Sequence, residues 1–178
     1  MARIVYADTT RPEAQRLVGR VIAERGNVLH IYRMLLHSPV FAASWLDLLS
    51  AIRLKSIVPG DLRELIIMRV AVLNGASYEA DQHAPIALAE GVSPAQLDDL
   101  HDWLVSPLFN LRQRAVLALT DAMTRGVQVP DDVFTAVRSE FDDQTVVELV
   151  TTVSAYNMVS RFLEALQVHS SDHVAPPD

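Results

Sequence analysis

The sequence predicts an all-α protein, and three observations support that prediction. Apolar residues recur at helical spacing along almost the whole chain, and no alternating strand of useful length interrupts them. Proline and glycine stand where helices would begin and end, as at Pro12 and Gly26. Half of the 178 residues are hydrophobic and 21% are charged, which is typical of a folded globular chain and not of a disordered one.

Three helices are predicted in the first third of the chain. They lie in the stretches 12–26, 27–38 and 38–56. The third opens with a Ser-Pro start signal and carries an apolar stripe at helical spacing, which predicts that this stripe faces the core. The stripe consists of Phe41, Trp45, Leu48 and Leu49.

The next predicted helix, in the stretch 59–75, contains the first candidate for a polar role. Asp61 and Glu64 stand in the N-cap and N3 register of a capping box, where Glu64 would only satisfy a backbone N–H. The residues that follow are nearly all apolar through Val72, so we expect this helix to be buried on most sides.

Five further helices are predicted after Gly75, in the stretches 77–91, 93–103, 110–126, 130–141 and 142–168. Two of them open with capping-box pairs, Ser93 with Gln96 and Asn110 with Gln113. No repeat and no linker divides the chain. We therefore expect an N-terminal arm over residues 1–12, one domain over 13–168 and a disordered polar tail over 169–178.

Charge and composition exclude several classes of function. The net charge is -7 and Lys55 is the only lysine, which argues against a nucleic-acid partner. No apolar run approaches the roughly 20 residues of a membrane span, and the N-terminus lacks a hydrophobic signal core, so we expect no membrane partner and a cytoplasmic location. The absence of cysteine excludes disulfides, thiolate metal sites and a thiol nucleophile.

The stretch "NGASYEADQH" contains a candidate acid/base pair. Glu79 and His83 are four residues apart, so they share one face of a helix. Glu79 would lie in the first turn, where the helix dipole favours its anion, and could hold His83 in one tautomer or raise its pKa. The same spacing is also common on solvated helix surfaces, and spacing alone leaves both interpretations open. Two side chains are too few to hold a metal ion, so no metal site is predicted.

A longer stretch, "RELIIMRVAVLNGASYEADQHAPIALAEGVS", resembles the carboxymuconolactone decarboxylase and alkylhydroperoxidase AhpD-like superfamily. Its members show a Glu, then Cys-x-x-Cys or a substituted form of it, then x-x-x-His and a downstream Gly. Glu64, Ala76, Glu79 and His83 occupy that pattern in order, with Ala76 and Glu79 at the two cysteine positions. The resemblance covers about residues 25–168 and implies an AhpD-like helical fold, a single domain in a homo-oligomer, trimer or hexamer, with active sites near subunit contacts.

The resemblance also implies a function. Thiol peroxidase activity is excluded, because the chain lacks both the nucleophile and the resolving thiol. The remaining pattern resembles the decarboxylase branch, which acts without a cofactor on a carboxylated unsaturated lactone from aromatic breakdown. By this resemblance His83 is the general acid, Glu79 orients it and Glu64 completes the relay.

A carboxylated substrate needs a pocket wall and a cation. The candidates for substrate binding are Tyr78, Arg69, Arg33 and Arg161. Tyr78 could equally be a core aromatic residue. Two other functions stay open on the same fold: a different lyase or isomerase of specialised metabolism, and a non-catalytic oligomeric binding protein.

Overall fold

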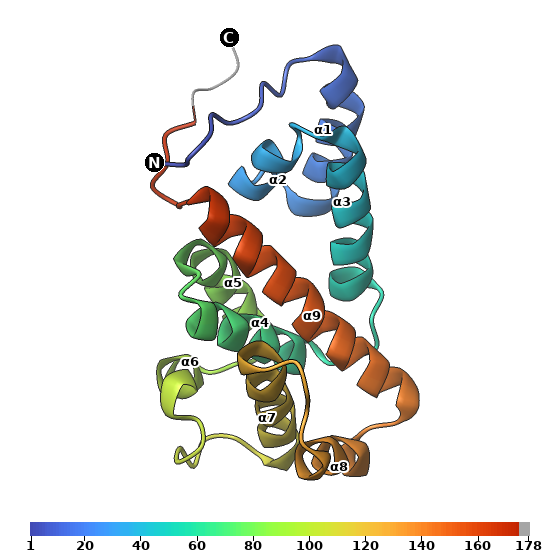
Figure 1. The fold of residues 1–178 in the computed structure, drawn as a ribbon, viewed down its shortest axis with the longest axis vertical. Helices are drawn as coiled ribbons and strands as arrows, with labels where there is room; N and C mark the ends of the chain where they lie inside the picture. The colour runs from blue at the N-terminus through green and yellow to red at the C-terminus, as the bar shows by residue number, and fades with distance from the viewer. Residues whose placement is uncertain (175–178) are drawn as a thin grey trace. The chain divides into compact units, whose positions relative to one another are not determined.

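The computed structural model describes residues 1–174, and within them the only regular elements are helices (Figure 1). The predicted all-α class is therefore confirmed. In chain order the elements are α1 (Pro12–Arg25), α2 (His30–Leu35), α3 (Pro39–Leu54), α4 (Gly60–Asn74), α5 (Ser77–Ala89), α6 (Pro94–Asp98), the short 3-10 helix η1 (Asp99–Asp102), α7 (Leu111–Arg125), α8 (Asp131–Glu140) and α9 (Asp143–Leu166).

The chain forms two compact units. One comprises residues 1–55 with the described part of 163–178, and the other comprises residues 56–162. In the first unit α1 and α2 both pack against α3. No helix within residues 1–174 is long and apolar enough to cross a membrane.

The prediction that the apolar stripe of α3 faces the core is wrong for two of its residues. Phe41 is 63% exposed and Leu48 is 37% exposed, whereas Leu49 is buried. The buried face of the helix also carries Ala42 and Leu46. These three buried residues follow the helical spacing i, i+4, i+7, and this face is rotated by about 100° from Phe41.

Extended segments near the two ends of the chain contact each other in the first unit. The backbone N–H of Arg3 donates to the carbonyl of Leu166 at 2.8 Å, and the Tyr6 hydroxyl donates to Asp172 at 2.7 Å. Asp172 also accepts a bond from the backbone N–H of His169 at 3.1 Å. Residues 175–178 of the tail that was predicted to be disordered lie outside the described residues.

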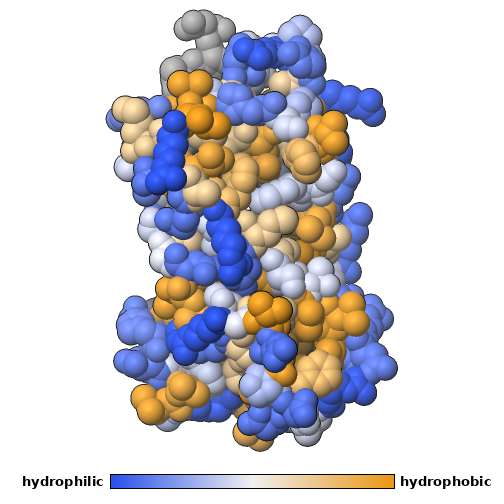
Figure 2. Space-filling view, viewed as in Figure 1, coloured by the Kyte–Doolittle hydropathy of each residue, from blue (hydrophilic) through white to orange (hydrophobic). Residues whose placement is uncertain are grey.

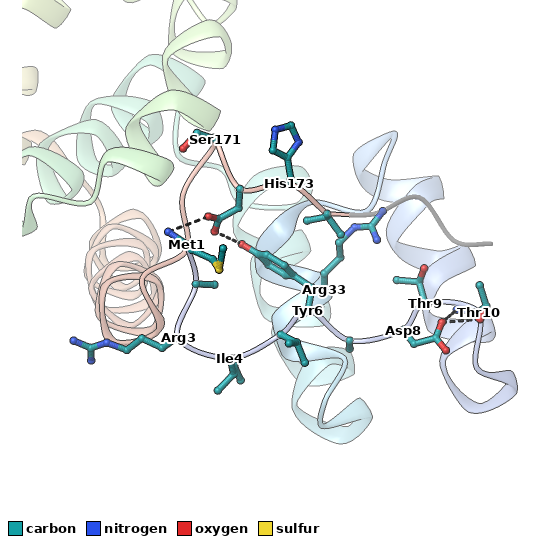
Figure 3. A pocket seen from close by; sticks show the side chains of 15 residues that line it. Met1, Arg3, Ile4, Tyr6, Asp8, Thr9, Thr10, Arg33, Ser171 and His173 are labelled. Atoms are coloured by element: carbon teal, nitrogen blue, oxygen red, sulfur yellow. Dashed lines mark hydrogen bonds and ion pairs between the residues drawn. The ribbon is translucent and has the colours of Figure 1, made fainter.

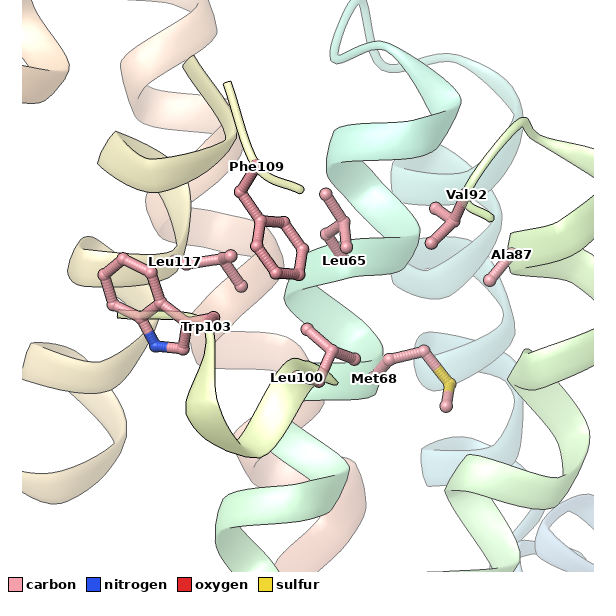
Figure 4. Packing of buried hydrophobic residues seen from close by; sticks show 8 residues of the cluster. All are labelled: Leu65, Met68, Ala87, Val92, Leu100, Trp103, Phe109 and Leu117. Carbon is pink, nitrogen blue, oxygen red and sulfur yellow. The ribbon is translucent and has the colours of Figure 1, made fainter. Parts of the chain in front are cut away.

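Helix α4 is the centre of the second unit. Ten consecutive residues from Leu62 to Ala71 are buried, because α5, α7 and η1 all pack against this helix. Figure 4 shows part of this core, in which Leu65 and Met68 of α4 lie among apolar side chains of the neighbouring elements. The prediction that this helix is buried on most sides is confirmed.

The capping box predicted at Asp61 and Glu64 is wrong. Helix α4 begins at Gly60, after Pro59, and no side chain caps its N-terminus. Glu64 therefore lies inside the helix and points into the protein, with 0% exposure. At the other end Gly75 adopts φ 66°, a left-handed conformation that glycine accepts at little cost, and α5 begins directly afterwards.

The two other predicted capping boxes are confirmed. The side chain of Ser93 accepts a bond from the N–H of Gln96 at 3.2 Å, and that of Asn110 accepts one from Gln113 at 3.0 Å. In both pairs the glutamine side chain bonds back to the N-cap N–H. These caps hold the entry to α6 and to α7.

Candidate active site

Two side chains from adjacent helices form a buried acid/base pair. Nδ1 of His83, on α5, donates to Oε2 of Glu64, on α4, at 2.8 Å. Glu64 is fully buried and the His83 side chain is 11% exposed. This bond fixes the tautomer in which Nδ1 carries a hydrogen, so Nε2 is the ring nitrogen that gains or loses a proton when the ring titrates.

The pair departs from the arrangement expected from sequence. The bond to Nδ1 comes from Glu64, and the orienting role predicted for Glu79 stays a prediction. Glu64 was expected to complete a relay, and it contacts the ring directly. The reason is that α4 and α5 pack side by side over their length, which places residues 64 and 83 opposite each other.

Glu64 is held as an anion. Burial raises the pKa of its carboxyl group, but hydrogen bonds and charge interactions with His83 and Arg63 outweigh that effect, so the net pKa lies below its usual range. Nε of Arg63 donates to Oε1 of Glu64 at 3.1 Å. An anionic Glu64 in a buried site favours the protonated ring of His83.

Glu79 lies in the first turn of α5 and is 2% exposed. Its Oε2 accepts a bond from the hydroxyl of Ser160, on α9, at 2.6 Å. Ser160 is itself 0% exposed. A carboxylate buried in this way needs such donors, so Ser160 fixes one oxygen of Glu79.

Two tyrosines of the second unit lie on helices of the site, and one of them contacts His83. The ring of Tyr156, on α9, meets the ring of His83 edge to face, with 5.2 Å between centroids. Tyr78 precedes Glu79 on α5 and is 4% exposed. The site thus gathers residues from three helices: α4, α5 and α9.

Sequence reasoning did not identify Ser160, Tyr156 or Arg63 as site residues. Ser160 lies 81 residues beyond Glu79, so no local spacing could connect them. Arg63 did carry a signal, because it is a charged residue beside Glu64 in a helix that is otherwise strongly apolar.

The three candidate arginines have different surroundings. Arg69 is 2% exposed and donates from Nε and Nη2 to the two carboxylate oxygens of Asp121, at 2.6 and 2.7 Å, and from Nη1 to the carbonyl of Leu100. All its nitrogens thus have partners within the core. Arg161 is exposed on α9 and donates from Nη1 to the backbone and side-chain oxygens of Asn157.

Arg33 lies in the first unit, whereas Glu64, Glu79 and His83 belong to the second. It lines a cavity of about 720 Å³ together with residues of the N-terminal segment and of the segment 171–174 (Figure 3). Nε of Arg33 donates to the carbonyl of Val28 at 3.3 Å. This cavity therefore contains none of the acid/base residues. Within residues 1–174, no group of three or more His, Asp or Glu side chains could hold a metal ion.

The segment that contains the site is similar in sequence to known proteins. Residues 39–122 match the model of the carboxymuconolactone decarboxylase family. The uncharacterized protein YdfG of Bacillus subtilis (strain 168) is 29% identical over 106 residues, which cover 58% of this chain and 72% of YdfG. The matched residues include Glu64, Glu79 and His83.

Solved structures share the fold. A protein of unknown function from Agrobacterium tumefaciens, described as a putative antioxidant defence protein AhpD, superposes with a TM-score of 0.72 at 24% identity, over 80% of this chain and 96% of that one. The debrominase Bmp8, in a substituted form bound to 2,3,4-tribromopyrrole, superposes with a TM-score of 0.80 at 17% identity, over 95% of this chain and 92% of that one.

Proposed function

We propose that the chain is a member of the carboxymuconolactone decarboxylase and AhpD-like superfamily, whose decarboxylase family model matches residues 39–122, and that it is a cytoplasmic, cofactor-independent acid/base enzyme. Its substrate is a small carboxylated lactone or a related metabolite, and its reaction is the loss of CO2 followed by protonation at carbon. The single observation that supports this most strongly is the buried Glu64–His83 hydrogen bond of 2.8 Å.

The proposed chemistry needs only a proton donor and an oriented substrate. When the bond between the substrate carbon and its carboxylate breaks, CO2 leaves and the electron pair enters the conjugated lactone as a dienolate. The protonated His83 then gives its Nε2 proton to the dienolate carbon and is left neutral. The lactone itself accepts the electrons, and solvent returns a proton to His83 after release of product.

The surrounding residues suit this role. The anionic Glu64 keeps the Nδ1 hydrogen in place and balances the charge of the imidazolium. Tyr156, on α9, meets the ring edge to face, and Glu79 lies one turn before His83 on the same helix, with one oxygen held by Ser160. Tyr78 is proposed as a wall of the substrate site, and Arg161 is the candidate cation for the substrate carboxylate, because it belongs to the same unit and is exposed.

The superfamily's thiol chemistry is not available at this site. Ala76 and Glu79 stand at the two positions that carry cysteine in the peroxidase pattern, and the sequence contains no cysteine. A related fold, that of the debrominase Bmp8, holds a tribrominated pyrrole, which is a small planar ring. We therefore propose that the substrate of this chain is of similar size, a small planar ring compound.

We also propose that the chain forms a homo-oligomer, a trimer or hexamer, through an apolar surface. Figure 2 shows apolar side chains among hydrophilic ones on the face in view. Leu104, Val105 and Leu111 are 67%, 85% and 76% exposed, which is unusual for large apolar residues so close together in sequence. Arg114 holds the segment that carries them, because it donates to the carbonyls of Leu104 and Phe109, at 3.1 and 3.0 Å.

The function is tested with a panel of carboxylated unsaturated lactones in D2O. We expect CO2 release with one deuterium placed on the product carbon, and loss of both in His83→Gln. If the protein binds one member of the panel tightly but turns over none of them, the enzyme proposal is wrong and the protein is a binding protein. Turnover without loss of CO2 would instead indicate another lyase or an isomerase.

A further inference from the structure

Arg63 lies between two carboxylates, one buried and one at the surface. Its Nε donates to Oε1 of Glu64 at 3.1 Å, and its Nη2 donates to Oε1 of Glu90 at 2.8 Å. The Arg63 side chain is 9% exposed and that of Glu90 is 41% exposed. Three consecutive hydrogen bonds therefore lead from a surface carboxylate to the ring of His83.

The position of Glu90 depends on a glycine. Glu90 follows the last residue of α5, and its carboxylate lies directly against Gly60, the first residue of α4. A Cβ atom at position 60 would be 1.8 Å from Oε2 of Glu90, so any other residue would displace this carboxylate. Gly60 thus leaves the space in which Glu90 can reach Arg63.

We propose that Arg63 and Glu90 are positioning residues, which aim the Glu64 carboxylate at His83 and link the protonation of that ring to charge at the protein surface. The inference deepens the proposed function, because it assigns two further residues to the same site. Neither residue touches the reacting atoms, and both act through Glu64.

The signs of the charges give this proposal a definite direction. From Glu90 to His83 the charges alternate: negative, positive, negative and, on a protonated ring, positive. Removal of the positive Arg63 should make the protonated ring of His83 more favourable, because a like charge is lost. Removal of the negative Glu90 should make it less favourable, because the charge of Arg63 is then no longer offset.

Other groups at the ring must be held constant. Glu79 on the same helix and Tyr156 from α9 also lie near His83. Arg63→Gln and Glu90→Gln leave both of these in place. Arg63→Lys keeps the positive charge but lacks the fork of donors that allows one side chain to bridge two carboxylates.

The test is an NMR titration of the His83 ring in the full-length protein, without substrate. We expect the midpoint to rise in Arg63→Gln and to fall in Glu90→Gln, with the larger change in Arg63→Gln because it contacts Glu64 directly. Arg63→Lys should lie between the wild type and Arg63→Gln. Shifts of the same sign in Arg63→Gln and Glu90→Gln, or no shift in either, would overturn the proposal.

Two further variants separate position from charge. Gly60→Ala keeps every charge but displaces the Glu90 carboxylate, so its midpoint should shift in the same direction as that of Glu90→Gln. Asp98→Asn removes an exposed charge at the end of α6 and should leave the midpoint unchanged. An unshifted midpoint in Gly60→Ala, or an Asp98→Asn shift as large as that of Glu90→Gln, would contradict the positioning role.

The failure of this inference and the failure of the proposed function can be told apart. The ring titration needs no substrate, so it can succeed in a protein that turns nothing over. Where a substrate is found, the pH at which kcat is half-maximal should move with the NMR midpoint in each variant. If the NMR midpoint moves but the pH dependence of kcat does not, Arg63 and Glu90 still control the protonation of His83. His83 is then not the group whose protonation limits kcat.

Discussion

Glu64 and His83 are 19 residues apart in sequence, and their side chains meet in a 2.8 Å hydrogen bond between two packed helices. The bond is shielded from water on the side of Glu64, which is 0% exposed. A charged hydrogen bond in such surroundings is stronger and more directional than one at the surface. The pair therefore has the geometry of a proton donor and its orienting carboxylate.

Glu64→Gln should destabilise the protein in a manner that depends on pH. The pKa of Glu64 lies below its ordinary value of 4.5 in the folded protein, so its contribution to stability is complete above that value and is lost as pH falls through the folded pKa. At pH 7 we expect a loss of about 1–3 kcal/mol in the free energy of unfolding.

Urea unfolding of the wild type and of Glu64→Gln at several pH values checks this expectation. The difference between them should shrink as pH falls below 4.5, because Glu64 is then protonated in the folded wild type. A difference that is the same at pH 7 and at about pH 3.5 would mean that Glu64 is not held as an anion in the folded protein.

Ser160→Ala should reveal the importance of the buried bond to Glu79. It removes the donor to Oε2 of Glu79, and the expected cost is about 1–3 kcal/mol, because a buried carboxylate oxygen loses its partner. Ser154→Ala on the exposed face of the same helix is the matched control and should change stability by about 0.5 kcal/mol or less. If Ser160→Ala and Ser154→Ala lower the free energy of unfolding equally, in thermal or urea unfolding, the Ser160–Glu79 bond does not contribute to stability.

Arg69→Met distinguishes a structural role for Arg69 from a role in substrate binding. Arg69 binds both oxygens of the Asp121 carboxylate in the core, so its loss removes both short charged hydrogen bonds of that carboxylate and should cost about 3–5 kcal/mol. Arg125→Met is the control. Arg125 pairs with the same Asp121 carboxylate, at 3.6 Å, but its side chain is 62% exposed. A stable Arg69→Met protein with a raised KM would restore Arg69 as a substrate-binding residue.

Val105→Glu should weaken the proposed self-association. Val105 is 85% exposed in a segment that Arg114 holds in place, and a charge there cannot be buried against a second copy of the chain. Sedimentation velocity should show a smaller species than for the wild type, whereas Val127→Glu, at another exposed position, should not. If both variants sediment like the wild type, the segment 104–111 is not part of an oligomer contact.

Much of the fold could be predicted because its signals are local. The capping boxes at Ser93 and Asn110 and the glycine at position 75 act within a few residues, and all three mark helix ends in the structure. The face of α3 could not be predicted reliably, because apolar residues lie on several sides of that helix and only packing against α1 and α2 decides which are buried.

Three candidate residues of the site could be named from the sequence, but the bonds that hold them could not be predicted. Glu64, Glu79 and His83 stood out through the family pattern, and the structure places all three in one unit. The bond from Glu64 to His83 and the bond from Ser160 to Glu79 depend on how separate helices pack, and neither follows from spacing along one helix. Spacing alone pointed to the neighbour on the same helix, Glu79.

The most direct test of His83 as the general acid is the kcat of His83→Gln on a substrate that the wild type turns over. Glutamine preserves hydrogen bonding but cannot deliver a proton, so we predict that kcat falls by about 10²–10⁴-fold while circular dichroism shows an unchanged helical fold. A His83→Gln enzyme whose kcat stays within about threefold of the wild type would contradict this role.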